Sequence, residues 1–258
     1  MTRQEAKERL VEATINSLEK VERESRLAEK ENRIPKIVHF CFLGWNHIPI
    51  GYLDRIRHWM EVLPKDWVFV NWTPLIKPIE SNLEKWLFDH DKRAFYADVV
   101  RCKQVSRYGG VYLDCDVEIH KDLTPLLNRD YIFCKEIIQP YMDGGVFMAK
   151  KGNRFLKIIS DRYDRTTPEE YKKEPRRFLL GDAWTRALKD AGVRIIYDGI
   201  DTFEKFDYHL ENPVDNEVYC IDTRFFCNPI RFYQKQLHWV KPNPDAWTSH
   251  LFTNSWSY

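Results

Sequence analysis

Apolar residues along this chain follow two patterns: short continuous runs, and longer segments in which they recur every three or four positions. The runs are typical of buried strands, and the recurring spacing is typical of amphipathic helices. We expect strands at 36–44, 67–72, 131–135, 144–149 and 193–197, and helices at 49–62, 79–91, 93–108, 153–163 and 177–191. From about residue 200 onward, the pattern predicts loops with short strands.

This alternation of strands and helices predicts an α/β fold with a mainly parallel central sheet and flanking helices. In such sheets, ligands bind beyond the carboxyl ends of the strands. Residues 1–32 are dense in Glu, Lys and Arg, with a narrow apolar stripe, and predict a charged N-terminal helix. We expect this helix to dock on the domain formed by residues 33–258. Contact with a partner or a membrane surface is the alternative.

The stretch GGVYLDCDVEIHKD, which starts at Gly109, alternates between apolar and polar residues and predicts a half-buried strand. Asp114 and Asp116 then point to the same side. Two neighbouring carboxylates repel each other unless a cation lies between them or one is protonated. Mg²⁺ and Mn²⁺ prefer oxygen ligands and often bridge one or two carboxylates to phosphate. The pair therefore suits a metal–diphosphate site, and a solvent-facing polar strand is the alternative.

The helix before this strand adds two charged residues. Asp98 and Arg101 are three positions apart and share one face of the helix. They either form a surface salt bridge or point into a site where Asp accepts hydrogen bonds from sugar hydroxyls and Arg supplies fixed donors.

The amino-acid composition limits the kinds of function that the chain can have. The chain has 258 residues, 43% of them hydrophobic, which suffices for one sizeable core. Its net charge of +1 gives no reason to expect nucleic acid as a partner. No apolar run is long enough to span a membrane and no signal core is visible, so we expect a cytoplasmic protein, with peripheral contact at the inner face of the membrane as an option. The six cysteines form no C-x-x-C pair and are expected to be free thiols.

The segment YADVVRCKQVSRYGGVYLDCDVEIHKDLTPLL resembles the core of family-32 glycosyltransferases, the type found in capsular polysaccharide synthesis and among yeast mannosyltransferases. It is also similar to the catalytic domain of the large clostridial glucosylating toxins. RIPKIVHFCFLGW and HLFTNSW resemble the first strand and the closing segment of the family. The resemblance implies a GT-A fold, a nucleotide-sugar donor, with a UDP-sugar favoured, and Mn²⁺ or Mg²⁺ as cofactor. It also implies transfer with retention of configuration.

The same resemblance assigns roles to individual residues. Asp116 would ligate the metal, and Asp114 would contact the ribose and the metal shell. Asp98 and Arg101 would hold the donor sugar. The remaining donor contacts would be Tyr112 beside the nucleotide and Phe42 stacked on the base.

Further assignments fall on the later part of the chain. His250 or Asn254 would complete the metal shell, and Ser255 and Trp256 would close over the diphosphate. Asp143 would face the acceptor, unless it is only a turn residue before two glycines. Asp182 either contacts the donor or begins a helix as its N-cap.

The resulting expectation is a metal-dependent retaining glycosyltransferase. It would transfer a hexose to a saccharide or lipid-linked saccharide acceptor in bacterial capsular or surface polysaccharide synthesis. A toxin-like protein glycosyltransferase, a nucleotide-sugar hydrolase and a non-catalytic binding subunit are the alternatives. No residue stands out as a nucleophile or general base, so the leaving phosphate itself is expected to help deprotonate the acceptor.

Overall fold

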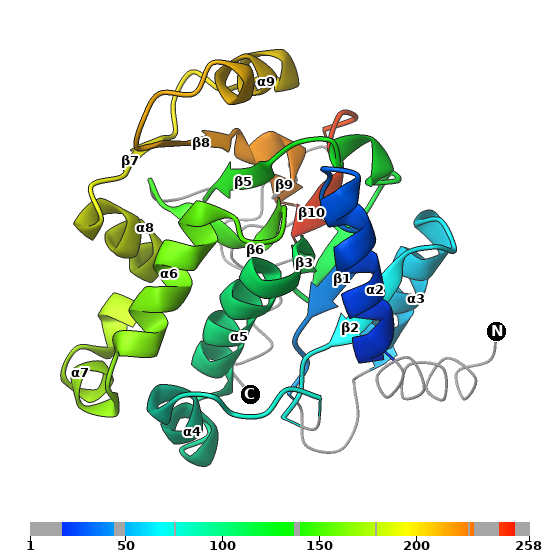
Figure 1. The fold of residues 1–258 in the computed structure, drawn as a ribbon. Helices are drawn as coiled ribbons and strands as arrows, with labels where there is room; N and C mark the ends of the chain where they lie inside the picture. The colour runs from blue at the N-terminus through cyan, green and yellow to red at the C-terminus, as the bar shows by residue number, and fades with distance from the viewer. Residues whose placement is uncertain are drawn as a thin grey trace.

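A seven-stranded sheet forms the centre of the protein (Figure 1). The computed structural model describes residues 17–43, 50–74, 76–136, 140–178, 180–226, 228–229 and 243–250. The strand order is β2-β1-β3-β6-β5-β8-β7. The strands are β1 (Ile37–Phe40), β2 (Val68–Asn71), β3 (Gly110–Leu113), β5 (Tyr131–Lys135), β6 (Met142–Ala149), β7 (Arg194–Ile196) and β8 (Glu217–Ile221). Only β6 runs antiparallel to its neighbours, so the prediction of a mainly parallel sheet is confirmed.

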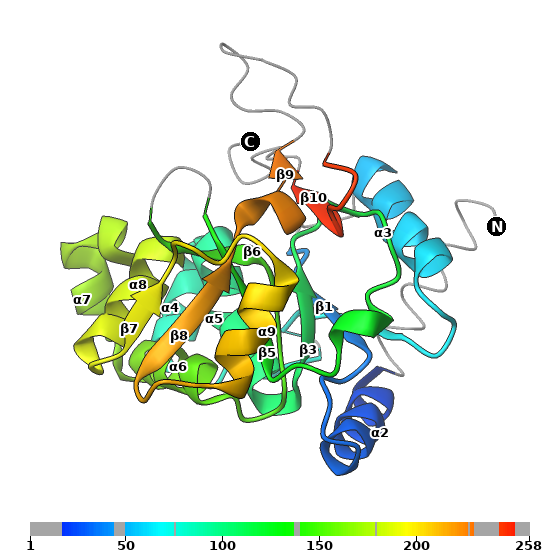
Figure 2. The ribbon, with the colours of Figure 1, turned by 90° about the horizontal axis from the view of Figure 1, so that it is seen from above.

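A second, three-stranded sheet lies beside the first, beyond β3 (Figure 2). It contains β4 (Val117–Ile119), β9 (Asn228–Pro229) and β10 (Thr248–His250). The central strand β10 runs antiparallel to β4 and parallel to β9. The chain passes from the large sheet to the small one between β3 and β4, so residues 114–116 lie at the junction of the two sheets.

Helices cover the large sheet and follow the predicted segments closely. They are α2 (Ser17–Lys30), α3 (Ile50–Val62), α4 (Asn82–Asp89), α5 (Arg93–Tyr108), α6 (Arg154–Arg165), α7 (Pro168–Lys173), α8 (Leu180–Asp190) and α9 (Phe203–Glu211). Single 3₁₀ turns occur at Thr124–Leu126, Pro175–Phe178 and Thr223–Phe225. Helix α9 lies where only loops and short strands were expected, so that prediction was wrong. None of the helices in the described ranges is long and apolar enough to cross a bilayer.

Helix α2 packs on the domain beside β2 and β1. Val21 and Ala28 are fully buried, and the Ser25 hydroxyl donates to the backbone carbonyl of Tyr108 over 2.6 Å. The same helix exposes a row of basic residues on its other side. Five cysteines lie in the described residues, and all five are free thiols, as predicted. Cys227 lies outside the described residues.

The turn that joins α5 to β3 requires both of its glycines. Gly109 and Gly110 have φ angles of 70° and 121°, which side-chain-bearing residues rarely adopt. A Cβ atom on Gly110 would lie 2.6 Å from Nε2 of the buried His39. This close packing directs β3 along β1, with Val38 beside Val111, and brings the end of β3 to the carboxyl edge of the sheet.

Candidate active site

The two aspartates of the D-x-D motif lie in a turn rather than in a strand. Strand β3 ends at Leu113, and β4 begins at Val117 in the other sheet. The amide of Asp114 donates to the Gly145 carbonyl over 2.8 Å, and the amide of Val117 donates to the Asp114 carbonyl over 2.9 Å. The predicted continuous strand was therefore wrong, because the hydrogen bond from the Val117 amide to the Asp114 carbonyl closes a turn here.

Tyr112 also departs from the prediction. The alternation placed its side chain on a polar, half-exposed face, but it is fully buried. Its ring lies under the guanidinium of Arg101, with 4.6 Å between the guanidinium carbon and the ring centroid. Its hydroxyl donates to Oδ1 of Asp114 over 3.0 Å. Strand β3 is therefore buried on both faces, as is typical of strands in parallel sheets.

Arg101 is the centre of a buried group of charges. Its Nη2 atom lies 2.9 Å from Oδ1 of Asp98, and its Nη1 atom lies 3.1 Å from Oδ1 of Asp114. Nη1 also donates to the backbone carbonyl of Gly144 over 2.7 Å. Asp98 and Arg101 are thus part of the candidate site rather than an isolated surface salt bridge.

Burial changes the acidity of these groups. It raises the pKa of Asp98 to about 7, although the nearby Arg101 acts in the opposite direction. Burial also raises the pKa of Asp114, which Arg101 and His250 partly offset. For Arg101, burial opposes the charge, but Asp114, Tyr112 and Asp98 outweigh it and hold the pKa of the guanidinium well above its usual value. The arrangement therefore keeps one fixed positive charge beside carboxyls that bind protons more readily than usual.

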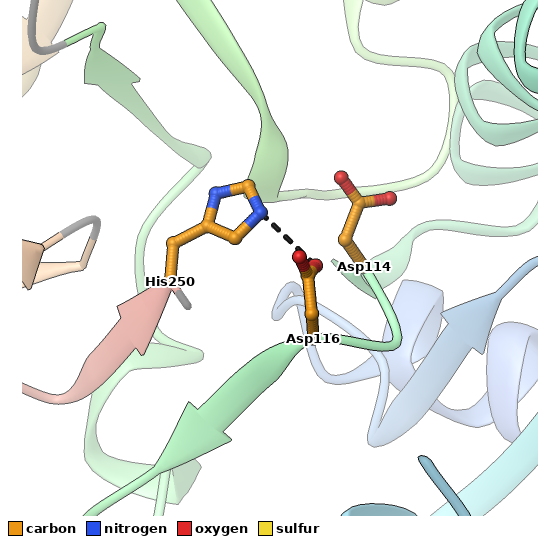
Figure 3. A group of neighbouring side chains, drawn as sticks. All are labelled: Asp114, Asp116 and His250. Carbon is orange, nitrogen blue, oxygen red and sulfur yellow. Dashed lines mark hydrogen bonds and ion pairs between the residues drawn. The ribbon is translucent and has the colours of Figure 1, made fainter. Parts of the chain in front are cut away.

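Asp114, Asp116 and His250 form a compact set of potential metal ligands (Figure 3). One ligand atom from each residue lies within 4.8 Å of the others. Nε2 of His250 is 3.0 Å from Oδ1 of Asp116, and β10 carries the imidazole to the D-x-D turn by pairing with β4. Two carboxylates and one imidazole fit a divalent cation such as Mn²⁺, which takes oxygen and nitrogen ligands.

Gly145 makes room for this cluster. A Cβ atom at this position would lie 2.8 Å from Cε1 of His250 and 3.1 Å from Oδ2 of Asp114. No other residue type would leave both side chains where they are. Gly145 on β6 therefore serves the site, and the turn that the sequence suggested at the two glycines is a strand in the structure.

Asp143 lies at the edge of the cluster. It lies within β6, so the alternative of a turn residue before two glycines was wrong. Its Oδ1 atom accepts a hydrogen bond of 3.0 Å from the Gly145 amide. It also raises the pKa of Glu136, which burial and this neighbour together bring to about 7. Sequence patterns did not point to Glu136, since a single Glu after an apolar run is common.

Phe42 follows β1 on the other side of the D-x-D turn. Its amide donates to Oδ1 of Asn71 over 2.8 Å, and its ring centroid is 5.8 Å from that of Tyr52. Arg55, one helical turn after Tyr52, donates to the Cys115 carbonyl over 3.0 Å. Sequence reasoning missed Tyr52 and Arg55 because their segment showed only an amphipathic helix.

The remaining predicted residues are not brought into this cluster by the described structure. Asn254, Ser255 and Trp256 lie outside the described residues. Asp182 lies within the first turn of α8 and pairs with Arg186 at 2.8 Å, so its interpretation as an N-cap was wrong.

Comparisons with known proteins find relatives among yeast enzymes. Inositol phosphoceramide mannosyltransferase 3 of Schizosaccharomyces pombe is 33% identical over 100 residues, which cover 37% of this chain and 28% of the relative. Mannosyl phosphorylinositol ceramide synthase CSH1 of Saccharomyces cerevisiae is 23% identical over 201 residues, which cover 69% of this chain and 50% of the relative. The chain thus spans half or less of the length of these two relatives.

The fold is that of a GT-A-like glycosyltransferase. The PaToxG glycosyltransferase structure superposes with a TM-score of 0.50 and 14% identity, covering 79% of this chain and 86% of that one. In sequence, residues 10–133 match the family described as "Glycosyltransferase sugar-binding region containing DXD motif". The matched range includes Asp98, Arg101 and both aspartates of the D-x-D turn. Residues 10–133 are thus similar to the DXD-containing sugar-binding region of glycosyltransferases.

Proposed function

We propose that this protein is a metal-dependent, retaining glycosyltransferase of the family-32 type. It transfers a hexose from a nucleotide-sugar to a saccharide acceptor. The observation that carries the proposal is the junction of the two sheets, where Asp114, Asp116 and His250 converge beside Arg101. A fixed, buried guanidinium beside potential metal ligands suits a negatively charged diphosphate rather than a neutral sugar alone.

Each group has a role in this proposal. Asp114, Asp116 and His250 would hold Mn²⁺ or Mg²⁺, which would supply positive charge for the diphosphate leaving group. Arg101, fixed by Asp98 and by the Gly144 carbonyl, presents donors that need no reorganisation when negative charge develops.

The donor and acceptor contacts follow from the neighbouring residues. Asp98 accepts hydrogen bonds from the donor sugar, and Phe42 with Tyr52 provides aromatic surface for the base. Asp143 faces the acceptor side of the cluster. Ser255, Trp256 and Asn254 remain proposed contacts to the diphosphate and the metal.

The donor is proposed to be a UDP-sugar, with GDP-mannose as the second choice because both curated relatives are named for mannosyl transfer. The acceptor is proposed to be a saccharide or lipid-linked saccharide in bacterial capsular or surface polysaccharide synthesis. With such an acceptor, the enzyme is proposed to act in the cytoplasm or at the inner face of the membrane.

A donor panel tests the proposal. The protein is incubated with Mn²⁺ and with UDP-glucose, UDP-galactose, UDP-N-acetylglucosamine or GDP-mannose, and release of the nucleoside diphosphate is followed with and without simple glycosides as acceptors. We expect one donor to be consumed only with metal, faster with an acceptor, and not by Asp116→Asn. Full turnover without any acceptor would identify a hydrolase. Unchanged activity of Asp116→Asn would overturn the metal assignment, and the anomeric configuration of the product tests retention.

A further inference from the structure

A basic groove lies on the side of the protein away from the D-x-D turn. One wall is helix α2 and the other is the segment 65–69, which leads into the edge strand β2. The groove has a volume of about 820 Å³ and is lined by seven Lys or Arg residues but only two acidic ones, Glu24 and Asp66. The lining of this groove is therefore much more basic than the chain as a whole, whose net charge is +1.

The cations at the floor of the groove are already neutralised. Arg33, half-buried, pairs with Glu24 at 2.7 Å and with Glu31 at 2.6 Å. Lys36, also half-buried, pairs with Asp66. A small anion entering the groove would have to displace these carboxylates, so the floor is poorly suited to a discrete anionic ligand.

The cations at the rim are different. We call Lys20, Arg23, Lys30 and Lys65 the rim cations: all four are exposed, and none has an acidic partner among the described residues. On α2, the spacing of Lys20, Arg23, Leu27 and Lys30 places them on one face of the helix. Leu27 lies among these charges and is 45% exposed.

Exposed cations around an exposed leucine on a helix face suit an anionic lipid surface. Long basic side chains reach phosphate headgroups, and the apolar side chain enters the boundary with the acyl chains. An extended acidic peptide would instead require free cations along the floor. We propose that the rim cations and Leu27 form a docking surface for membranes rich in anionic phospholipid.

The position of α2 has a consequence for the site. Helix α2 lies on the opposite side of the domain from β9 and β10, with β1 and β3 between them (Figure 2). A protein docked through α2 therefore points its D-x-D turn away from the lipid. Removing the rim cations should leave turnover of a water-soluble donor unchanged.

Vesicle sedimentation tests the proposal. The native protein is mixed with phosphatidylcholine vesicles with and without about 30% phosphatidylglycerol, at roughly 0.15 M salt. The groove variant Lys20→Gln/Arg23→Gln/Lys30→Gln is compared with Lys157→Gln/Lys173→Gln/Lys189→Gln, which removes the same charge from exposed positions on α6, α7 and α8. Each basic residue near an anionic surface contributes about fivefold to partitioning, so the groove variant should bind roughly a hundredfold more weakly.

The control variant should keep most of the binding to anionic vesicles. Leu27→Gln in the otherwise native protein should weaken vesicle binding further at high salt, where the electrostatic attraction is screened. Equal losses in both triple variants would reduce the effect to non-specific attraction and overturn the proposal. So would native protein that ignores the anionic vesicles, or that binds poly-glutamate but not the vesicles. Thermal melts of all variants establish that they are folded.

Discussion

The Nη2 atom of Arg101 lies 2.9 Å from the Oδ1 atom of Asp98, one helical turn earlier, and both side chains are buried. Asp98 thereby fixes the guanidinium in the direction of Asp114. Removing either partner affects both the stability of the fold and the charge at the site.

Arg101→Met should abolish measurable turnover and lower the free energy of unfolding. Loss of one partner of a buried ion pair costs about 3–5 kcal/mol, because the carboxylates that remain are buried without compensation. Asp98→Asn should cost less, since burial already raises the pKa of this carboxyl to about 7 and the amide resembles its protonated form. Urea unfolding of both single variants and the double variant measures the coupling. Additive losses would show that the pair does not act as a unit.

His250→Ala should weaken metal binding without preventing folding. Loss of one of three protein ligands is expected to raise the dissociation constant for Mn²⁺ by roughly tenfold or more. Electron paramagnetic resonance of free Mn²⁺ during a titration measures this directly. His90→Ala, at the exposed end of α4, is the matched control. If both variants bind Mn²⁺ as the native protein does, His250 is not a ligand.

Gly145→Ala should damage the same site through shape alone. The added methyl group would lie 2.8 Å from Cε1 of His250, so the imidazole must move away from Asp114. We expect metal-dependent binding of nucleoside diphosphate to weaken roughly tenfold, an effect of about 1.4 kcal/mol, in isothermal titration calorimetry. Gly51→Ala is the control, because a Cβ there would meet nothing within 4 Å. Equal affinities for the two variants would contradict the tight packing at Gly145.

The buried His39 predicts an acid-sensitive fold. Its Nδ1 atom accepts from the Trp72 indole over 2.9 Å, so Nε2 carries the proton and donates to the Gly109 carbonyl over 2.8 Å. Burial lowers the pKa of His39 to about 4 from 6.5, with the Gly109 bond acting in the opposite direction. The unfolded chain therefore binds more protons between these values. The contribution of His39 to the free energy of unfolding is therefore fully present above pH 6.5. It decreases by roughly 3 kcal/mol as the pH falls towards 4.

Urea unfolding at several pH values checks this prediction. His39→Gln should be less stable than the native protein at pH 7.5, and the difference should shrink towards pH 4, because only the native chain loses the histidine contribution. A difference that stays constant over this range would show that His39 does not titrate as its burial implies.

Most of the large sheet could be predicted from the sequence because its strands are continuous apolar runs. Helix α9 was missed, although Thr202 accepts from the Lys205 amide as an N-cap and Phe203, Phe206 and Leu210 have helical spacing. The region after residue 200 is rich in aromatic and polar residues, so this helical spacing was not recognised. The D-x-D turn was missed for the opposite reason, because its flanking residues alternate as a strand does.

The candidate site could be predicted only in part. Asp98, Arg101 and the two aspartates lie close together in sequence, so local spacing indicated their common site. The approach of His250 to Asp116 depends on strand pairing in the second sheet, which local patterns do not encode. The contribution of Tyr52 and Arg55 likewise depends on how α3 packs near Cys115.

The potential metal ligands at the D-x-D turn come from parts of the chain that are synthesised at different times. Asp116 and His250 are separated by 134 positions, and four of the seven strands of the large sheet, β5 to β8, lie between them in sequence. A chain that stops before β10 contains both aspartates but lacks the imidazole of His250. The candidate ligand set is therefore complete only after β10 has been synthesised, and copies that stop before it should be poor at capturing the ion.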